Sequence, residues 1–380
     1  MHRSKEVIIR RMSDPVNRLP LIDALKAVAA LLVLLTHFSS YGPLAAGVQA
    51  AYPLLFGWFY DYGRLAVQLF LVIAGFLAAR GLAARGQALA GSPLPLIWKR
   101  YRRLVVPYLA AIGLAIVAAA IADHWMDDEA TPARATLGQW LAHALLLQSI
   151  LGFESLSAGV WYVAIDFQLF ALMTILLWAG RIRLLAPALV LVLTTLSLFW
   201  FNRDTRLDNW ALYFFGAYGL GAAAWWAADR KQLALWLGVI FSVTIAALVL
   251  DFRLRIALAL GVAMLLGFGR RYGFLEKFPN IPLLPFLGQI SYSLFLVHFP
   301  VLLLANGLYA RFELSSPVAA MTALLLALAA SIAAAGIFYR WIESPAASRR
   351  ITDALAWLFD KVVEQTRKLP RFGNRLADRA

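Results

Sequence analysis

The stretch IDALKAVAALLVLLTHFSS, residues 22–40, decides how this chain folds. It is apolar along most of its length, and about 20 such residues suffice to cross a bilayer as a helix. It nevertheless holds Lys26 and His37, and an ionisable side chain inside a membrane is costly unless it has a partner or a task. The stretch therefore predicts a membrane helix with two functional side chains on its inward face.

The rest of the chain has the same apolar character. Of 380 residues, 62% are hydrophobic and 15% are charged, whereas soluble domains have about 45–50% and about 25%. The apolar residues form long blocks, so the sequence predicts an all-α, polytopic integral membrane helix bundle. The net charge of +14 does not indicate a nucleic-acid partner, because the basic residues are spread between the blocks. The absence of cysteine excludes disulfides and thiolate metal sites.

Charge placement sets the predicted topology. With both termini cytoplasmic, 27 of the 35 lysines and arginines lie on the cytoplasmic side, as expected for a multi-pass protein of the inner (cytoplasmic) membrane. Residues 138–153 are short for a span, so we expect an interfacial or re-entrant segment there, with an eleventh span as the alternative. We expect about ten transmembrane helices, at residues 19–40, 62–80, 103–122, 158–180, 184–201, 210–228, 232–250, 254–269, 285–308 and 316–340.

The chain divides into three predicted parts. They are a basic cytoplasmic N-terminal tail at 1–18, a transmembrane domain at 19–345 and a cytoplasmic tail at 346–380. In the last part, apolar residues recur every three or four positions between charges, which predicts an amphipathic helix lying on anionic membrane lipids. These apolar residues are Ile351, Leu355, Leu358 and Val362.

Polar residues inside the predicted spans are the candidate site residues. Lys26 and His37 are eleven residues apart, which places them on one face of a helix and roughly 16 Å apart along its axis. Lys26 could instead extend to the interface and pair with Asp23, and His37 could serve only as a hydrogen bond across the bundle. Asp166 is expected at the depth of His37, with Tyr162 one turn earlier on its helix. A carboxylate beside an imidazole suits a general base, although such a pair could also only hold two helices together.

Two further groups stand out along the chain. His298 lies near the middle of the ninth predicted span, with Ser291 on the same face, either as a site residue or as a structural contact between helices. A basic cluster opens the third span, where guanidinium groups match phosphate geometry, although anionic lipid headgroups alone would favour it too. We expect no metal, because no group of residues has metal-ligand spacing. The basic cluster comprises Lys99, Arg100, Arg102 and Arg103.

Six segments follow one another in order along the chain: LPLIDALKAVAALLVLLTH, LAVQLFLVIAGFL, KRYRRLVVPYL, VWYVAIDFQLF, LGQISYSLFLVHFP and YRWIESP, the last containing Glu343. Together they resemble the acyltransferase-3 family of multi-pass membrane O-acyltransferases, over about residues 19–345. Three positions depart from the usual family pattern. Lys26 stands in place of arginine, Ala74 in place of serine and Asp166 in place of glutamate.

The resemblance implies transfer of an acyl group, commonly acetyl, from cytoplasmic acyl-CoA to a hydroxyl of an extracytoplasmic glycan or lipid-linked saccharide. Such O-acetylation is a polysaccharide modification of the cell envelope. On this basis His37 with Asp166 would deprotonate the acceptor, or His37 would carry the acyl group itself, and Lys26 would assist the donor. The phosphates of CoA would be held by the basic cluster, Arg100, Arg103, Arg102 and Lys99. The sequence does not give the acceptor, the acyl chain or the oligomeric state.

Two other functions fit parts of the sequence. Buried lysine, histidine and aspartate would also suit a proton-coupled transporter or flippase of a sugar, lipid or glycolipid. Transporters often carry internal repeats and paired broken helices, and neither is evident in the sequence. The amphipathic tail would suit a non-catalytic assembly partner in an envelope complex.

Overall fold

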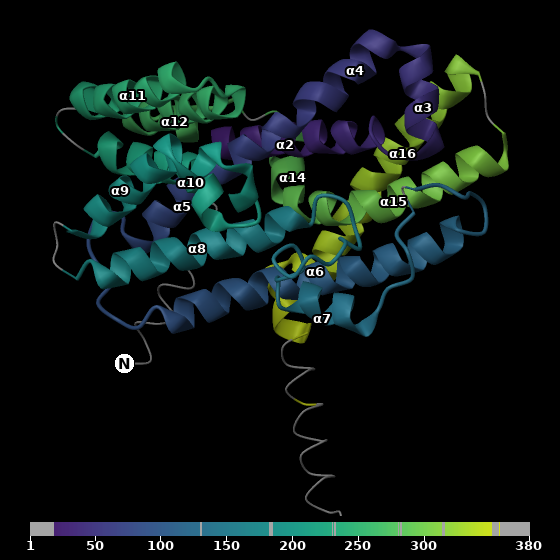
Figure 1. Cartoon of the computed structure of the whole chain (residues 1–380), viewed down its shortest axis with the longest axis horizontal. Helices are drawn as coiled ribbons and strands as arrows, with labels where there is room; N and C mark the ends of the chain where they lie inside the picture. Colours follow the sequence, from purple (N-terminus) through teal and green to yellow (C-terminus); the bar gives the residue numbers. More distant parts are fainter. Residues whose placement is uncertain are drawn as a thin grey trace, which may run out of the picture.

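The computed structural model of the chain is built from helices (Figure 1). It describes residues 19–129, 131–181, 185–229, 231, 233–279, 281, 283–313, 316–351 and 357. These ranges contain no strand, which confirms the predicted all-α class. Most of the predicted amphipathic helix in 346–380 lies outside the described residues.

A helix lies at each of the ten positions predicted for a span. Eight helical segments in the described ranges are long and apolar enough to cross a membrane, so the chain is a multi-pass membrane protein. Helices α10 and α12 are not among the eight, and the total of ten spans stays a prediction. The ten helices are α2 (Pro20–Phe38), α5 (Val67–Leu82), α6 (Leu94–Ala122), α8 (Trp161–Ala179), α9 (Leu185–Phe199), α10 (Ala211–Ala228), α11 (Leu233–Leu250), α12 (Leu254–Tyr272), α15 (Ser291–Arg311) and α16 (Pro317–Phe338).

Helix α10 differs from the other long helices because protein surrounds it. It packs against α5, α8, α9, α11 and α12, and nearly all of its residues are buried. A helix that does not face lipid needs no lipid-like surface, so tyrosine, tryptophan and glycine can replace leucine and valine along it. Its tyrosines, tryptophans and glycines therefore contact other helices and not lipid.

The shorter elements differ from the predicted helix arrangement in three places. Helices α3 (Gly42–Ala51) and α4 (Pro53–Tyr62) follow α2 and were not expected. The segment 138–153 contains α7 (Leu137–Ala144), whose eight residues are too few to cross a bilayer, so the alternative of an eleventh span is wrong. The predicted ninth span is divided into α14 (Leu283–Gln289) and α15. The remaining elements are η2 (Gly63–Ala66), η3 (Phe201–Arg203), η4 (Thr205–Leu207), α13 (Phe274–Lys277) and the π-helical turn η5 (Tyr339–Glu343).

The basic cluster is part of helix α6 and does not precede it. The predicted span began at residue 103, whereas α6 begins at Leu94 and runs for 29 residues. Lysine and arginine are good helix formers, so the helix extends past its apolar portion. As a result Arg100 stands one or two turns inside a continuous helix that packs against α8 and α15.

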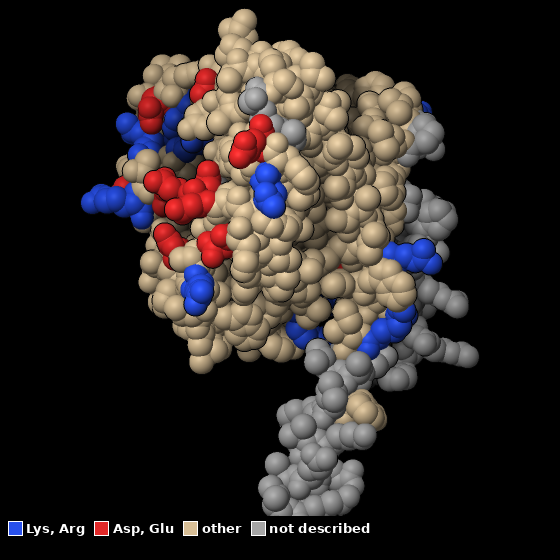
Figure 2. Space-filling view, turned by 90° about the vertical axis from the view of Figure 1, so that its right-hand side faces the viewer, with Lys and Arg blue, Asp and Glu red and all other residues tan. Residues whose placement is uncertain are grey.

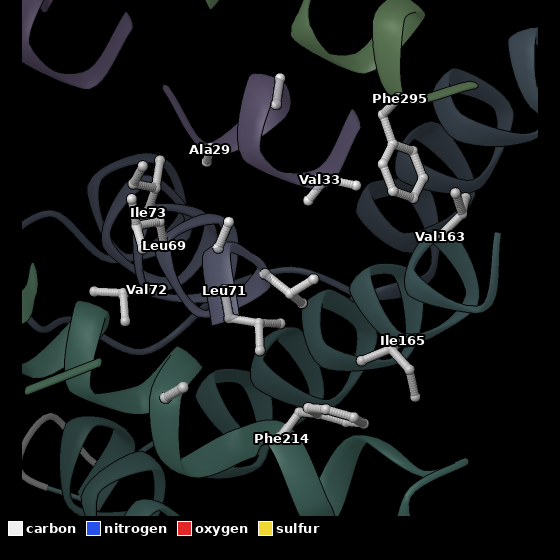
Figure 3. Close-up of a cluster of buried hydrophobic side chains, with 14 of the residues drawn as sticks. Ala29, Val33, Leu69, Leu71, Val72, Ile73, Val163, Ile165, Phe214 and Phe295 are labelled. Atoms are coloured by element: carbon white, nitrogen blue, oxygen red, sulfur yellow. The ribbon is translucent and has the colours of Figure 1, made fainter. Parts of the chain in front are cut away.

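The core is formed where α2, α5, α8, α10 and α15 converge (Figure 3). Aliphatic side chains from α2 and α5 meet Phe214 of α10 and Phe295 of α15 there. Helices α5 and α10 cross closely enough that a Cβ at Gly75 would overlap the carbonyl of Tyr218, and one at Gly221 would overlap the carbonyl of Val72. These two glycines therefore allow backbone-to-backbone packing, as is common between membrane helices.

The surface is uncharged over broad areas. Figure 2 shows acidic and basic side chains gathered on parts of one face, with uncharged side chains over the rest. Large apolar side chains are exposed along α11 and α16, including Val249, Leu250, Leu325 and Leu326. Exposed leucine and valine on this scale suit a lipid environment, where they face hydrocarbon in place of water.

Candidate active site

The structure brings His37 of α2 and His298 of α15 together. His37 Nδ1 lies 2.6 Å from His298 Nε2, which is hydrogen-bond distance. The ring planes differ by 11° and the ring centres are 4.8 Å apart. Since the spacing between the two planes cannot exceed the 2.6 Å between the nitrogens, the rings meet edge to edge and not face to face. His298 is buried at 1% exposure, whereas His37 is partly exposed.

The surroundings of His37 hold its ring in place. Tyr41, one turn later on the chain, has its ring centre 5.6 Å from that of His37. Gly159, which precedes α8, has a φ of +77°, a region that favours glycine. A Cβ on Gly159 would lie 3.0 Å from His37 Cε1, so the absence of a side chain there leaves room for the imidazole.

The expected pairing of Asp166 with His37 is wrong. Asp166 of α8 is 5% exposed and accepts a hydrogen bond from Arg100 Nη2 at 2.5 Å, forming an ion pair between α8 and α6. The reason is the extended start of α6, which carries a guanidinium to the buried carboxylate. A guanidinium compensates a buried carboxylate better than a neutral imidazole, because it brings a full opposite charge.

Two more cations lie near this ion pair. Lys26 of α2 has Asp23, Arg103, Arg100 and Glu343 as electrostatic neighbours. Neither the Lys26 ammonium nor the Arg103 guanidinium takes part in a hydrogen bond or ion pair within the described ranges. Arg103 is exposed on α6 and Lys26 is half-buried. The structure thus gathers three cations near the carboxylates of Asp23, Asp166 and Glu343, and two of these cations form no ion pair in the described ranges.

Glu343 joins this group from the far end of the chain. It lies in the turn η5 and accepts a hydrogen bond of 2.5 Å from Ser293 Oγ of α15. Its electrostatic neighbours include Arg103 and Lys26. The closing segment YRWIESP is thereby brought to the same cations as the first helix.

The other expected site residues are placed less centrally. Ser291 donates to the carbonyl of Gly288 at the start of α15, which is a local contact. Tyr162 packs its ring on Phe295 and has Asp166 and Arg100 as electrostatic neighbours. The remaining cluster members, Lys99 and Arg102, are exposed on α6. In the described ranges, no three His, Asp or Glu side chains group as metal ligands would.

Sequence reasoning missed two tyrosines of the interior. Within the part of the chain that the structure describes, the hydroxyls of Tyr218 on α10 and Tyr108 on α6 are buried without a hydrogen-bond partner, as is Nε of Arg100. Tyr218 has Asp166 and Arg100 as electrostatic neighbours. The sequence signal for Tyr218 is the segment FGAYGLG, in which one tyrosine is surrounded by small and apolar residues. A hydroxyl in such a segment has few hydrogen-bond partners once the helix is buried.

The site therefore forms a row of polar groups through an apolar bundle. Lys26, Arg103 and Glu343 stand at one level, Arg100 and Asp166 beside them, and the histidine pair further along α2. Residues 19–340 of the chain match the model of the acyltransferase domain family, Acyl_transf_3. The chain belongs to the acyltransferase-3 family. This confirms the resemblance seen in the sequence motifs.

Membership covers nearly all of the site. Among the site residues, Glu343 alone lies just beyond the matched range of 19–340. The match and the apolar helices together identify a multi-pass membrane protein of an acyltransferase family. Comparison with curated proteins and with solved structures gave no match.

Proposed function

We propose that this acyltransferase-3 protein moves an acyl group, acetyl being the first candidate, from cytoplasmic acyl-CoA to a hydroxyl of an extracytoplasmic glycan or lipid-linked saccharide. The observation that carries the proposal is the row of polar groups, with two cations that form no ion pair in the described ranges at one end and an imidazole at the other. Family membership supplies the reaction class. The donor, the acceptor and the orientation in the inner membrane are parts of the proposal.

The donor end is proposed to lie at Lys26 and Arg103. Acyl-CoA carries several phosphate charges, and guanidinium and ammonium groups that are not held in an ion pair can bind them by charge-assisted hydrogen bonds. Arg100 is committed to Asp166 and its Nε is buried, so we assign the donor phosphates to Lys26 and Arg103. Lys99 and Arg102, exposed on α6, would draw the anionic donor toward this end.

The acceptor end is proposed to lie at His37. Lys26 and His37 are about 16 Å apart along α2, so a donor bound by its phosphates must extend its thioester along the bundle to reach the imidazole. His37 is partly exposed and can contact an acceptor, whereas Asp166 is held by Arg100. The acceptor hydroxyl would lose its proton to His37 as its oxygen attacks the acyl carbon. The apolar interior would keep water away from the thioester.

The change His37→Ala tests the proposal. In liposomes containing the purified full chain, we expect it to lower transfer of labelled acetyl from acetyl-CoA to native envelope glycans by at least about a hundredfold, the usual contribution of a general base. The measurement is label retained in the glycan fraction, with mass spectrometry to name the modified saccharide. His124→Ala, in an exposed loop, is the matched control.

Two outcomes would contradict the proposal. Normal transfer by the His37→Ala protein would remove His37 from the reaction. Movement of an unmodified saccharide across the membrane by the wild-type protein, without any need for acetyl-CoA, would instead indicate a transporter or flippase.

A further inference from the structure

The histidine pair specifies which nitrogen of His37 does the chemistry. We propose that His298 is a positioning residue that fixes the tautomer of His37, so that Nε2 of His37 is the atom that takes the proton of the acceptor hydroxyl. This inference rests on the proposed acyl transfer, and it deepens that proposal by separating the roles of the two histidines.

His298 is the buried end of the pair. His298 Nδ1 lies 3.2 Å from the carbonyl oxygen of Leu294, one turn earlier on α15. A carbonyl oxygen can only accept a hydrogen bond, so Nδ1 of His298 carries the hydrogen. A neutral imidazole has one N–H, and Nε2 of His298 is therefore left with a lone pair.

The lone pair on His298 in turn determines where His37 carries its hydrogen. Its Nδ1 lies 2.6 Å from that lone-pair nitrogen, so Nδ1 of His37 carries the hydrogen and donates it. Nε2 of His37 is consequently the unprotonated, basic atom. The edge-to-edge arrangement, with planes only 11° apart, directs the N–H and the lone pair along the line between the nitrogens.

Exposure assigns the two roles. His298 is 1% exposed and cannot meet a substrate, whereas His37 is partly exposed. His298 thus acts through His37, in the way that a second group orients the imidazole in other acyl-transfer sites. Tyr41 and the side-chain-free Gly159 leave the His37 ring in that orientation.

The transfer step balances with these atoms. The O–H bond of the acceptor breaks and its proton passes to Nε2 of His37, while the acceptor oxygen bonds to the acyl carbon. The C–S bond of the thioester breaks, and its electron pair leaves with sulfur. The thiolate then takes the proton from His37, which returns to its starting form. Between these events the positive charge on His37 is shared with His298 through their N–H···N bond.

The test compares His298→Phe with His298→Gln in the full chain in lipid nanodiscs. Phenylalanine keeps a ring but offers no acceptor, whereas the glutamine side-chain oxygen can accept from His37 Nδ1. With acetyl-CoA and native envelope glycans, we expect His298→Phe to lower kcat about a hundredfold and to leave KM for acetyl-CoA within about twofold. His298→Gln should recover at least about tenfold of that loss. His124→Gln in the exposed loop is the matched control.

The tautomer is read directly by nitrogen-15 spectra of labelled histidines, with His37 assigned by its absence from His37→Gln. We expect His37 in the wild-type protein to be protonated at Nδ1 and bare at Nε2, and to lose this preference in His298→Phe. A wild-type His37 protonated at Nε2, or a His298→Phe protein with normal kcat, would overturn the inference. Because the spectrum needs no turnover, a wild-type protein that shows the expected tautomer but transfers no acetyl would overturn only the proposed function.

Discussion

Arg100 and Arg103 are three residues apart on one helix, yet the fold gives them different partners. Arg100 compensates the buried carboxylate of Asp166, whereas Arg103 forms no ion pair with any residue that the structure describes. The first arginine is therefore needed for stability, and the second is available to a ligand. Truncating either would lower activity, but for different physical reasons.

This difference can be measured with Arg100→Gln and Arg103→Gln. We expect Arg100→Gln to lower the free energy of unfolding by about 3–5 kcal/mol, because a buried carboxylate is left without its counter-charge. Arg103→Gln should leave thermal unfolding unchanged and raise KM for acetyl-CoA about tenfold, the loss of one charge-assisted hydrogen bond. Thermal unfolding and steady-state kinetics are the two measurements.

The control for this comparison is Arg85→Gln, in an exposed loop that follows α5. It makes the same chemical change away from the site and should alter neither quantity. Unchanged KM in Arg103→Gln would reduce that residue to a signal for membrane topology.

The sequence could identify most of the polar residues of the site but not their partners. Lys26, His37, Asp166 and His298 are visible because an ionisable group in an apolar block is conspicuous. Their pairing depends on which helices are neighbours, and hydropathy reports depth but not lateral arrangement. His37 and His298 are 261 residues apart, so no local pattern links them.

Among the elements, α7 and the turns that follow it are connected by hydrogen bonds to one histidine. His143 donates from Nδ1 to the carbonyl of Gln139, and its Nε2 accepts from the backbone N–H of Leu156. Burial lowers the pKa of His143, and the hydrogen bond with Gln139 opposes that shift only in part. The neutral imidazole thus connects α7 to the segment that leads into α8.

Acidification should loosen this connection. The unfolded pKa of histidine is about 6.5 and the folded pKa is lower, so the stability that neutral His143 contributes is complete above about pH 6.5 and is lost as the pH falls toward the folded pKa. We expect hydrogen exchange of residues 145–160 to be faster at about pH 5.5 than at about pH 7.5, after correction for intrinsic rates. His143→Gln should remove this difference and His124→Gln should keep it, whereas a difference that persists in His143→Gln would contradict the prediction.

Helix positions could be read from the sequence more reliably than helix ends or short helices. Every predicted span contains a long helix, because the bilayer requires an apolar run of nearly fixed length. The hairpin of α3 and α4 was missed because Pro43 and Pro53 break its apolar residues into pieces too short to count as spans. The early start of α6 was missed because hydropathy does not register a helix made of charged residues.

At the scale of the whole molecule, we predict that α10 and α12 cross the membrane. The chain has no cysteine, so single cysteines can be introduced without a background. In a ten-span protein, we expect Asn209→Cys and Phe252→Cys to react with an impermeant maleimide from outside. Lys231→Cys and Lys277→Cys should react only after the membrane is opened. Labelling of Asn209→Cys and Lys231→Cys from the same side would show that α10 does not cross.

The π-helical turn η5 has a consequence for how the closing segment tolerates mutation. A π-helical turn holds one residue more than an α-helical one, and here it delivers Glu343 to Ser293. Removing one residue between Phe338 and Glu343 would let α16 continue as an ordinary helix and rotate the carboxylate by about 100°. Exchanging Trp341 or Ile342 for another side chain would leave the backbone path unchanged. The function of this segment therefore depends more on its length than on its composition. We expect single-residue deletions there to abolish the contact of Glu343 with Ser293, and substitutions of Trp341 or Ile342 to preserve it.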